Sequence, residues 1–267
     1  MQVQRSPRFR ASAGIIFPSL QAGAEAARHI VQAKLWPANC RVLDPGEAAR
    51  EAGLDGKLAL LVLGFESADI PQGDFMRAAI SLGRDCGGAI DEDAIKITDA
   101  ASGEAGRQGA VGSWRNSFLR APFDRNMTVA LGQVRDTVET AITWERWPEL
   151  DASVREALHD TLGKICGGGS VTCRFTHVYP DGPAPYYTFE GLTTQGGQIE
   201  TCDELKKAAL DAVIAAGGTV THHHAVGRYH RPWYDQQRPE VFAQALRAAK
   251  GAVDPNGVLN PGVLIDP

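Results

Sequence analysis

Three of the seven histidines in this chain stand in a row, at His222, His223 and His224. On an extended backbone side chains alternate, so we expect His222 and His224 to share one face and His223 to point the other way. Two imidazoles about 7 Å apart on one side of a strand can exchange protons with a single small ligand, because histidine titrates near neutral pH. Gly217 and Gly218, just upstream, permit close approach of the backbone. The triplet therefore predicts the edge of an active site.

Two other interpretations of the triplet stay open at this point. Zinc binding is one, but the chain contains neither an HExxH motif nor a CxxC pair. A solvent-exposed cluster without function is the other. We expect no metal site.

The ten residues after the triplet, AVGRYHRPWY (225–234), bring cations and aromatic rings together. Arg228, His230 and Arg231 could hold a phosphate or a carboxylate, each arginine through two parallel hydrogen bonds. The alternative is a solvated loop whose aromatic side chains fill the core.

Single residues elsewhere could also carry chemistry. Arg41 lies in a short apolar run, CRVLD, where a buried charge needs a partner such as Asp44 or an anionic ligand. Arg125, in APFDRNM, is a weaker case, since its loop can be solvated. Tyr186 and Tyr187 are neighbours in an expected strand, so one faces inward and one outward. A tyrosine beside histidine or arginine can donate or accept a proton, although tyrosine is also a common strand residue.

Composition narrows the class of protein. The 267 residues carry 27 Lys and Arg against 32 Asp and Glu, a formal net charge of −5, and 43% are hydrophobic. This balance is typical of a globular protein with a sizeable core and argues against a nucleic-acid binder, which usually has a concentrated basic face. No apolar run approaches the length of a membrane span, and no secretory signal is evident. Five widely spaced cysteines favour free thiols in a reducing compartment, so we expect a cytoplasmic protein.

Hydrophobic periodicity predicts an α+β fold. Strands are expected at 12–18, 41–43, 57–66, 137–144, 171–179 and 185–192, and helices at 21–34, 74–85, 150–165, 199–216 and 239–250. The order strand, helix, strand, strand, helix at the start is that of a ferredoxin-like split βαβ unit. We expect two such halves to form one antiparallel sheet with helices on one face. The stretch 100–127 holds too many aromatic residues for a linker and predicts a functional loop region.

The chain lacks the phosphate-binding motifs GxGxxG and Walker A, and the nucleophile motif GxSxG. Its segment THHHAVGRYHRPW nevertheless resembles the histidine-triplet signature of the alkylglycerone-phosphate synthases (alkyl-dihydroxyacetonephosphate synthases), flavoenzymes of the FAD-linked oxidase family. Further segments follow that family in order: PANCRVLDP, APFDRN with TVETAITWERW, VTCRFTHVYPDG, PYYTFEG and DPNGVLNPGVL. Ala225 departs from the pattern, in which we expect glycine after the triplet.

This resemblance implies the C-terminal substrate (cap) domain of the family, the part that follows an N-terminal FAD-binding domain in whole members. Residues 1–10 are then expected to be a remnant of the end of that missing domain, residues 11–218 the cap domain, and residues 219–267 the triplet segment with a tail that returns to the flavin domain. The implied cofactor is FAD, and a missing flavin domain explains why no phosphate loop is found.

Carried over by position, the resemblance assigns the triplet to catalysis. His222, His223 and His224 are expected to line the pocket that faces the flavin ring, with His222 and His223 also touching the cofactor. Tyr186 matches the acid/base tyrosine of the family. We therefore expect the phenol and the imidazoles to act together.

The same resemblance assigns three residues to binding. Arg41 and Arg125 match active-site arginines that suit the phosphate of a dihydroxyacetone-phosphate substrate. Asn260, in the tail, is expected to bind the cofactor.

The implied reaction is exchange of the acyl group of acyl-dihydroxyacetone phosphate for a fatty alcohol, a step of ether-lipid synthesis without net redox change. Two alternatives stay open: an FAD-linked oxidase or dehydrogenase of alcohols or 2-hydroxy acids, and a fragment that binds without catalysis. The expected partners are a phosphorylated or lipid substrate and the N-terminal FAD-binding domain, with no nucleic acid. A homodimer and a peripheral contact with a membrane are both compatible with the resemblance.

Overall fold

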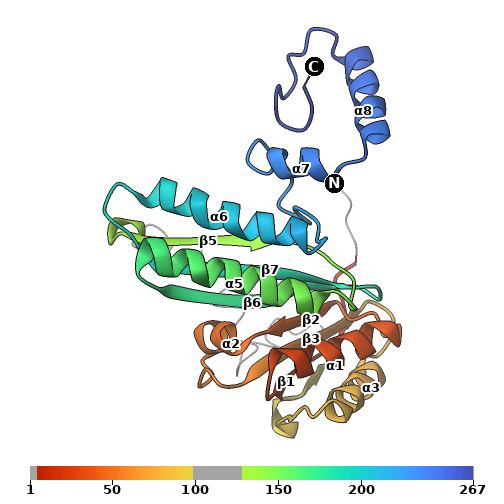
Figure 1. Cartoon of the computed structure of the whole chain (residues 1–267). Helices are drawn as coiled ribbons and strands as arrows, with labels where there is room; N and C mark the ends of the chain where they lie inside the picture. Colours follow the sequence, from red (N-terminus) through yellow and green to blue (C-terminus); the bar gives the residue numbers. More distant parts are fainter. Residues whose placement is uncertain (1–4, 99–127, 267) are drawn as a thin grey trace.

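The computed structural model describes residues 5–98 and 128–266, which form a seven-stranded sheet, the helices packed on it and a C-terminal lobe (Figure 1). The strands are β1 (Phe9–Phe17), β2 (Asn39–Leu43), β3 (Ala59–Ser67), β4 (Lys96–Thr98), β5 (Gln133–Glu139), β6 (Gly169–Val178) and β7 (Pro183–Leu192). The helices are α1 (Leu20–Gln32), α2 (Pro45–Ala52), α3 (Gly73–Asp85), α5 (Trp147–Cys166), α6 (Gln198–Ala215), α7 (Arg231–Gln237) and α8 (Glu240–Val253), with a short 3-10 helix, η1 (Glu92–Ala94).

The sheet is built from two halves of the same design. Its strand order is β4-β1-β3-β2-β6-β7-β5, and the neighbouring strands pair antiparallel. In the first half β3 lies between β1 and β2, and in the second β7 lies between β5 and β6. The halves join where β2 meets β6, with Leu43 opposite Arg174. The expected pair of ferredoxin-like units on one antiparallel sheet is confirmed.

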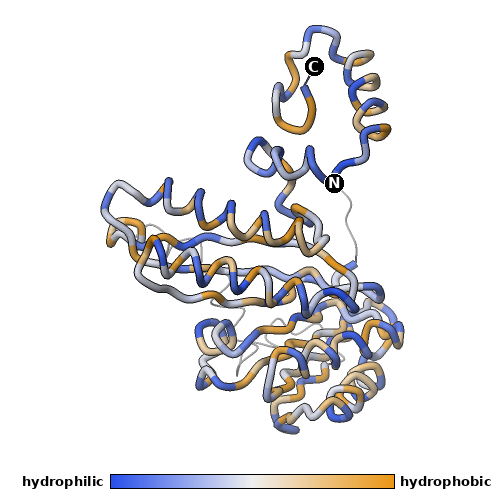
Figure 2. Tube along the Cα trace, in the orientation of Figure 1, coloured by the Kyte–Doolittle hydropathy of each residue, from blue (hydrophilic) through white to orange (hydrophobic). Residues whose placement is uncertain are grey.

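One face of the sheet carries the main core. Helices α1 and α3 pack on the first half and α5 and α6 on the second (Figure 1). Strand alternation turns Ile15, Leu61, Phe175 and Phe189 toward these helices, and all four are fully buried. Figure 2 shows the matching pattern, with hydrophobic stretches in the strands and alternating polarity along the helices. We call the other face of the sheet the open face.

Helix α2, which the hydrophobic pattern did not predict, lies on the open face. It begins after Asp44, whose side chain accepts a hydrogen bond from the Glu47 backbone N–H at 2.8 Å, and it has proline in its first turn. It ends at Gly53, whose φ of 74° is the left-handed conformation that glycine tolerates best. Its alanines cover Leu60 and Val62 of β3 in a small second core.

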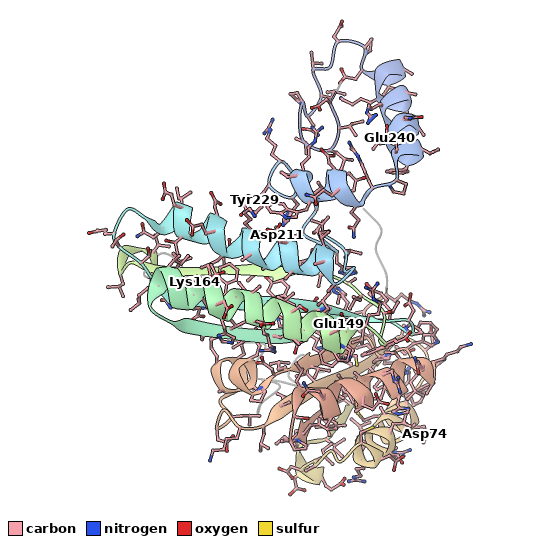
Figure 3. All side chains as sticks on the ribbon, viewed as in Figure 1. Asp74, Glu149, Lys164, Asp211, Tyr229 and Glu240 are labelled. Atoms are coloured by element: carbon pink, nitrogen blue, oxygen red, sulfur yellow. The ribbon has the colours of Figure 1, made fainter. Side chains whose placement is uncertain are left out.

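The C-terminal lobe, formed by α7, α8 and the tail, stands away from the sheet (Figure 1). Its link to the rest of the molecule runs over α6, where Trp233 Nε1 donates to Asp211 Oδ1 at 2.7 Å. Tyr229 lies in the same region, with the Lys206 ammonium 4.8 Å from its ring centre (Figure 3). Trp233 and Tyr234 of α7 also pack against the edge of the main core, so the lobe joins the domain through both polar and apolar contacts.

The state of the cysteines and the character of the helices bear on two further expectations. The five cysteines are all free thiols. Within the described ranges, none of the helices has the length and apolar character needed to cross a bilayer. The predicted loop region at 100–127 lies outside the described residues.

Candidate active site

The histidine triplet lies in a series of bends beside the end of β5. The backbone N–H groups of His222, His223 and His224 all donate to one carboxylate oxygen of Glu139, at 2.7, 2.8 and 2.8 Å. Three successive N–H groups can converge on one oxygen only if the chain curls around it, so the expected extended conformation is wrong. The alternation of faces is wrong for the same reason, because neighbouring rings of the triplet lie 5.6 and 4.6 Å apart.

The curl ends at Ala225. Its φ of 64° is in the left-handed region, where alanine is strained and glycine is not. This conformation suits the glycine that the resemblance leads us to expect at this position.

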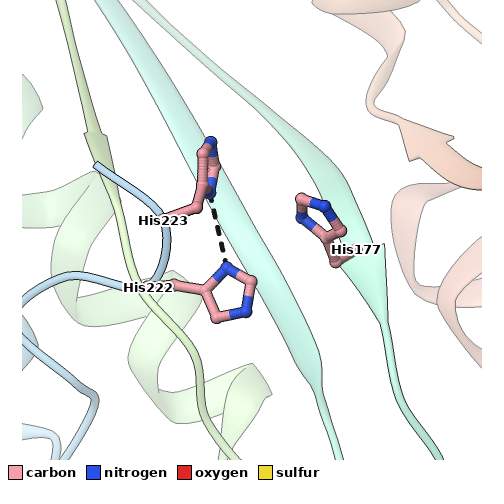
Figure 4. A group of neighbouring side chains, drawn as sticks. All are labelled: His177, His222 and His223. Atoms are coloured by element: carbon pink, nitrogen blue, oxygen red, sulfur yellow. Dashed lines mark hydrogen bonds between the residues drawn. The ribbon is translucent and has the colours of Figure 1, made fainter. Parts of the chain in front are cut away.

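His177, at the end of β6, faces His222 and His223 across a short gap (Figure 4). Its ring centre lies 5.1 Å from that of His222 and 5.3 Å from that of His223. His222 also has a polar partner, since its Nε2 lies 2.9 Å from the Tyr179 hydroxyl. Neither His177 nor Tyr179 has an unusual context in the sequence, although both lie in the segment VTCRFTHVYPDG.

Ring nitrogens of His177, His222 and His223 come within 4.8 Å of one another, the spread of a candidate metal site. Tetrahedral zinc with bonds of about 2.0–2.1 Å holds its nitrogen ligands roughly 3.4 Å apart, so the rings would have to move together to bind it. The expectation that no metal binds here stays a prediction.

Tyr186 on β7 lies at the centre of the site. It pairs directly with Glu139 on β5 and with Arg174 on β6, so the three side chains share the open face. The Arg174 guanidinium sits 4.2 Å from the centre of the phenol ring. The ring centres of His223 and His224 lie 6.1 and 5.3 Å from that of Tyr186. The structure therefore brings the predicted tyrosine together with two histidines of the triplet.

Tyr187, the next residue, turns to the helix side and is fully buried, as strand alternation predicts. Burial raises its pKa well above the ordinary value of a phenol. Tyr186, half-buried on the open face, is therefore the tyrosine that a substrate can reach.

Arg41 lines a cavity of about 400 Å³ at the seam between the two halves. Its neighbours in the wall include His177, Tyr179 and Trp36, so the cavity adjoins the histidine cluster. Asp44, suggested from the sequence as the partner of Arg41, instead caps α2 and accepts a hydrogen bond from Arg155 at 2.9 Å. Burial and the charge of Arg174 lower the pKa of Arg41, which is the effect expected of a site that favours an anion.

Burial also lowers the pKa of two imidazoles in the cluster. For His177 the neighbouring His222 and His223 act in the same direction as desolvation. For His224 desolvation is again the largest cause, opposed by the negative charge of Glu139. Near neutral pH these rings are therefore more fully in the neutral form, which can both accept and donate a proton.

Three other predicted residues lie outside this cluster or outside the described chain. Arg125 falls in the segment that is not described. Asn260 lines a second, largely apolar cavity of about 610 Å³ in the C-terminal lobe, together with Ala225. Arg231 is paired with Asp266 at 2.6 Å, which favours the structural interpretation of the loop 225–234 over an anion site.

Comparison with known proteins identifies the family. Residues 6–264 match the family model described as FAD linked oxidases, C-terminal domain. This chain belongs to that family. The assignment rests on a match to nearly the whole chain. It confirms the fold expected for the C-terminal domain of an FAD-linked oxidase.

Several curated relatives are synthases. The chain is 21% identical to the alkyldihydroxyacetonephosphate synthase of Trypanosoma brucei brucei over 99% of its length and 45% of that protein. It is 24% identical to the synthase of the same name from Caenorhabditis elegans over 97% of its length and 46% of that protein. The glycolate oxidase subunit GlcD of Bacillus subtilis is 23% identical over 92% of this chain and 49% of that protein. The chain thus spans about half the length of the curated relatives it matches.

A solved structure supports the fold. An alkyldihydroxyacetonephosphate synthase superposes with a TM-score of 0.70 at 16% identity, covering 96% of this chain and 45% of that one. At this level of identity the likeness concerns the fold alone.

Proposed function

We propose that this chain is the substrate-side domain of an FAD-dependent enzyme similar to alkyldihydroxyacetonephosphate synthase. In the proposed reaction the acyl group of acyl-dihydroxyacetone phosphate is exchanged for a fatty alcohol. Membership of the FAD-linked oxidase family supports an FAD-dependent enzyme. One observation carries the proposal furthest: the Tyr186 ring contacts His223 and His224 on the open face.

Different side chains of the site are proposed to transfer the proton and to bind the phosphate. Tyr186, whose ring lies against the triplet, moves the proton at the substrate carbon or oxygen, and the imidazoles of His223 and His224 take it up and return it. Arg41, in the wall of the seam cavity, binds the substrate phosphate through paired N–H groups. Arg125 is proposed as a second phosphate ligand on the resemblance alone.

The exposed rings of the cluster fit a flat aromatic cofactor. His177, His223 and His224 are exposed while their backbones are fixed, so they offer a preformed surface of imidazole edges. His222 and His223 are proposed to hold the flavin ring, with Asn260 as a further contact from the tail. When bound, FAD supplies the electrophilic and redox chemistry of its ring system, and this chain supplies orientation, phosphate binding and proton transfer.

An oxidoreductase of alcohols or 2-hydroxy acids is the second candidate. The likeness to the glycolate oxidase subunit GlcD favours it, and the same phenol and imidazoles would serve in proton removal from an alcohol. A third outcome, a module that binds without catalysis, applies if the chain acts without a flavin domain.

The division of the chain belongs to the same proposal. We keep residues 1–10 as the end of a preceding flavin domain, 11–218 as the cap domain, and 219–267 as the triplet segment and returning tail. A flavin domain as partner and a cytoplasmic location are proposed with it, the latter supported by the five free thiols. A homodimer and a peripheral membrane contact stay predictions of the resemblance.

Ligand binding to the chain tests the proposal. Trp36 is 71% exposed and lines the seam cavity with Arg41, so its fluorescence should report an occupant. Hexadecyl-dihydroxyacetone phosphate should change this emission and saturate, and Arg41→Ala should weaken its binding by about 10- to 100-fold, the worth of a charge-assisted hydrogen bond. Arg77→Ala, on the exposed side of α3, is the matched control and should bind as the parent chain does. Saturable binding of glycolate in place of the phosphorylated ligand would favour the oxidoreductase.

A further inference from the structure

Glu139 is the last residue of β5 and is only 3% exposed. One of its carboxylate oxygens, Oε1, accepts four hydrogen bonds. Three come from the backbone N–H groups of the triplet, and the fourth comes from the Thr221 hydroxyl at 2.7 Å. Successive N–H groups gathered on one anion form a nest, which holds the backbone in a fixed curl. The conformation of the triplet thus depends on a carboxylate 83 to 85 positions away in the sequence.

The second oxygen of Glu139 points at the rings themselves. Oε2 lies 2.9 Å from His223 Nδ1 and 3.7 Å from His222 Nδ1. The contact with His223 lacks the direction of a hydrogen bond and the contact with His222 is too long for one, so within the described ranges this buried oxygen has no hydrogen-bond partner. Although burial by itself raises the pKa of Glu139, the bonds from Thr221 and the three N–H groups lower it overall, so the group is an anion at neutral pH. A fixed negative charge therefore stands against two of the imidazoles.

Glu139 is also tied to the tyrosine. It is the direct cross-strand neighbour of Tyr186, and its nest places the rings of His223 and His224 against that phenol. A shift of the nest would move both imidazoles relative to the hydroxyl, because no regular element holds the triplet.

We propose that Glu139 is the positioning residue of this site. One oxygen fixes the backbone of the triplet, and the other sets the electrostatic environment of its rings. The catalytic meaning of this arrangement rests on the proposed function, whereas the arrangement itself does not. Glutamate is required because it supplies both a negative charge for the nest and a second oxygen for the rings.

Amide hydrogen exchange and NMR on the chain alone test this inference without flavin or substrate. Glu139→Gln keeps a carbonyl acceptor and the side-chain shape, so it removes the charge while leaving a hydrogen-bonding group in place. We expect exchange of the His222, His223 and His224 amides to accelerate by at least about tenfold. Each amide loses a hydrogen bond to a charged acceptor, and the free energy of such a bond corresponds to a factor of about ten or more. The ring-proton shifts of Tyr186 should change in the same variant, because they report the stacked and edge-on imidazoles.

Asp136→Asn is the matched control, since Asp136 lies on the same strand but accepts from Lys206 and Cys202 on the helix side. It should leave the three amides and the Tyr186 ring signals unchanged. If Glu139→Gln folds and its triplet amides exchange within twofold of the parent rates, the inference is wrong. If Glu139→Gln does not fold, Glu139→Asp gives the same test, because a shorter carboxylate keeps the charge and cannot reach all four donors. Normal exchange in that variant also overturns the inference.

Discussion

Tyr186 and Tyr187 are adjacent in β7, yet the sheet gives them opposite surroundings. Tyr186 lies among Arg174, His223 and His224 on the open face, and Tyr187 is buried against the helices. In the flavin-loaded enzyme Tyr186→Phe should lower turnover by about 10²- to 10⁴-fold, the usual worth of a general acid or base. Its unfolding free energy should change by no more than about 0.5 kcal/mol, because a half-buried residue loses only its hydroxyl.

The matched control for this change is Tyr187→Phe. It removes a hydroxyl one residue away that no substrate on the open face can reach, so turnover should be kept. Steady-state rates and urea denaturation of both variants test whether Tyr186 acts as the general acid or base. Full activity of Tyr186→Phe would refute an acid/base role.

Glu139 should also leave a signature in the pH dependence of stability. Its folded-state pKa lies below the ordinary value of about 4.5, chiefly through the hydrogen bonds that outweigh its burial. A carboxyl of this kind stabilises the fold above its unfolded-state pKa and loses that contribution as pH falls through the folded-state pKa. The gap in unfolding free energy between the parent chain and Glu139→Gln should therefore be constant from pH 8 to about pH 5 and shrink toward pH 3. Urea denaturation at a series of pH values measures it, and a gap that widens in acid would contradict the assignment.

At this scale the sequence could reveal only residues with an unusual context. The triplet stood out as three consecutive histidines, and Arg41 as a charge in an apolar run. Glu139 gave no such signal, because a glutamate at the end of a strand is ordinary and its partners lie more than 80 positions away. His177 and Arg174 were also missed, since only the register of β6 with β7 brings them to Tyr186 and the triplet.

Helix α2 shows how an element can depend on a single side chain. Asp44 caps this helix, and its other oxygen accepts from the Cys173 backbone N–H at 2.7 Å and from Arg155. Asp44→Ala should reduce the unfolding free energy by about 3 kcal/mol, because it removes the cap and leaves a half-buried guanidinium with one fewer partner. Thermal and urea denaturation provide the measurement.

Asp91→Ala is the control for the cap at Asp44. Asp91 caps the short 3-10 helix η1 on the exposed surface, and its loss should cost no more than about 0.5 kcal/mol. Equal losses in the two variants would show that Asp44 acts as a simple surface cap.

The strongly periodic elements could be predicted from the sequence, and the short or irregular ones could not. The long helices α1, α3, α5 and α6 and the hairpin β6–β7 are where the pattern placed them, because each buries a regular apolar face. Helix α2 was missed despite its Asp-Pro start and Gly end, since eight residues give too few repeats to recognise. The triplet was misjudged as extended because its conformation is imposed by Glu139 and not by local preference.

At the scale of the whole molecule, the candidate active site lies where the two halves of the sheet and the segment leading to the lobe meet. Arg41 comes from the first half, Tyr186 and His177 from the second, and the triplet from the segment that leads to the lobe. The pairing of halves was predictable from the repeated order of elements. The seam cavity was not, because it depends on how the part of β2 before Leu43 separates from the end of β6. In the lobe Val241 and Val253 are about four-fifths exposed, which supports the proposed return of the tail to a flavin domain.

Product and flavin state, followed together, test the central proposal most directly. The chain assembled with its flavin-binding domain would be given acyl-dihydroxyacetone phosphate and hexadecanol while the visible absorbance of the flavin is recorded. Our account predicts that the ether product and free fatty acid appear in equal amounts and that the flavin shows no net bleaching at the end of turnover. Lasting bleaching by an alcohol or a 2-hydroxy acid, without ether product, would contradict it.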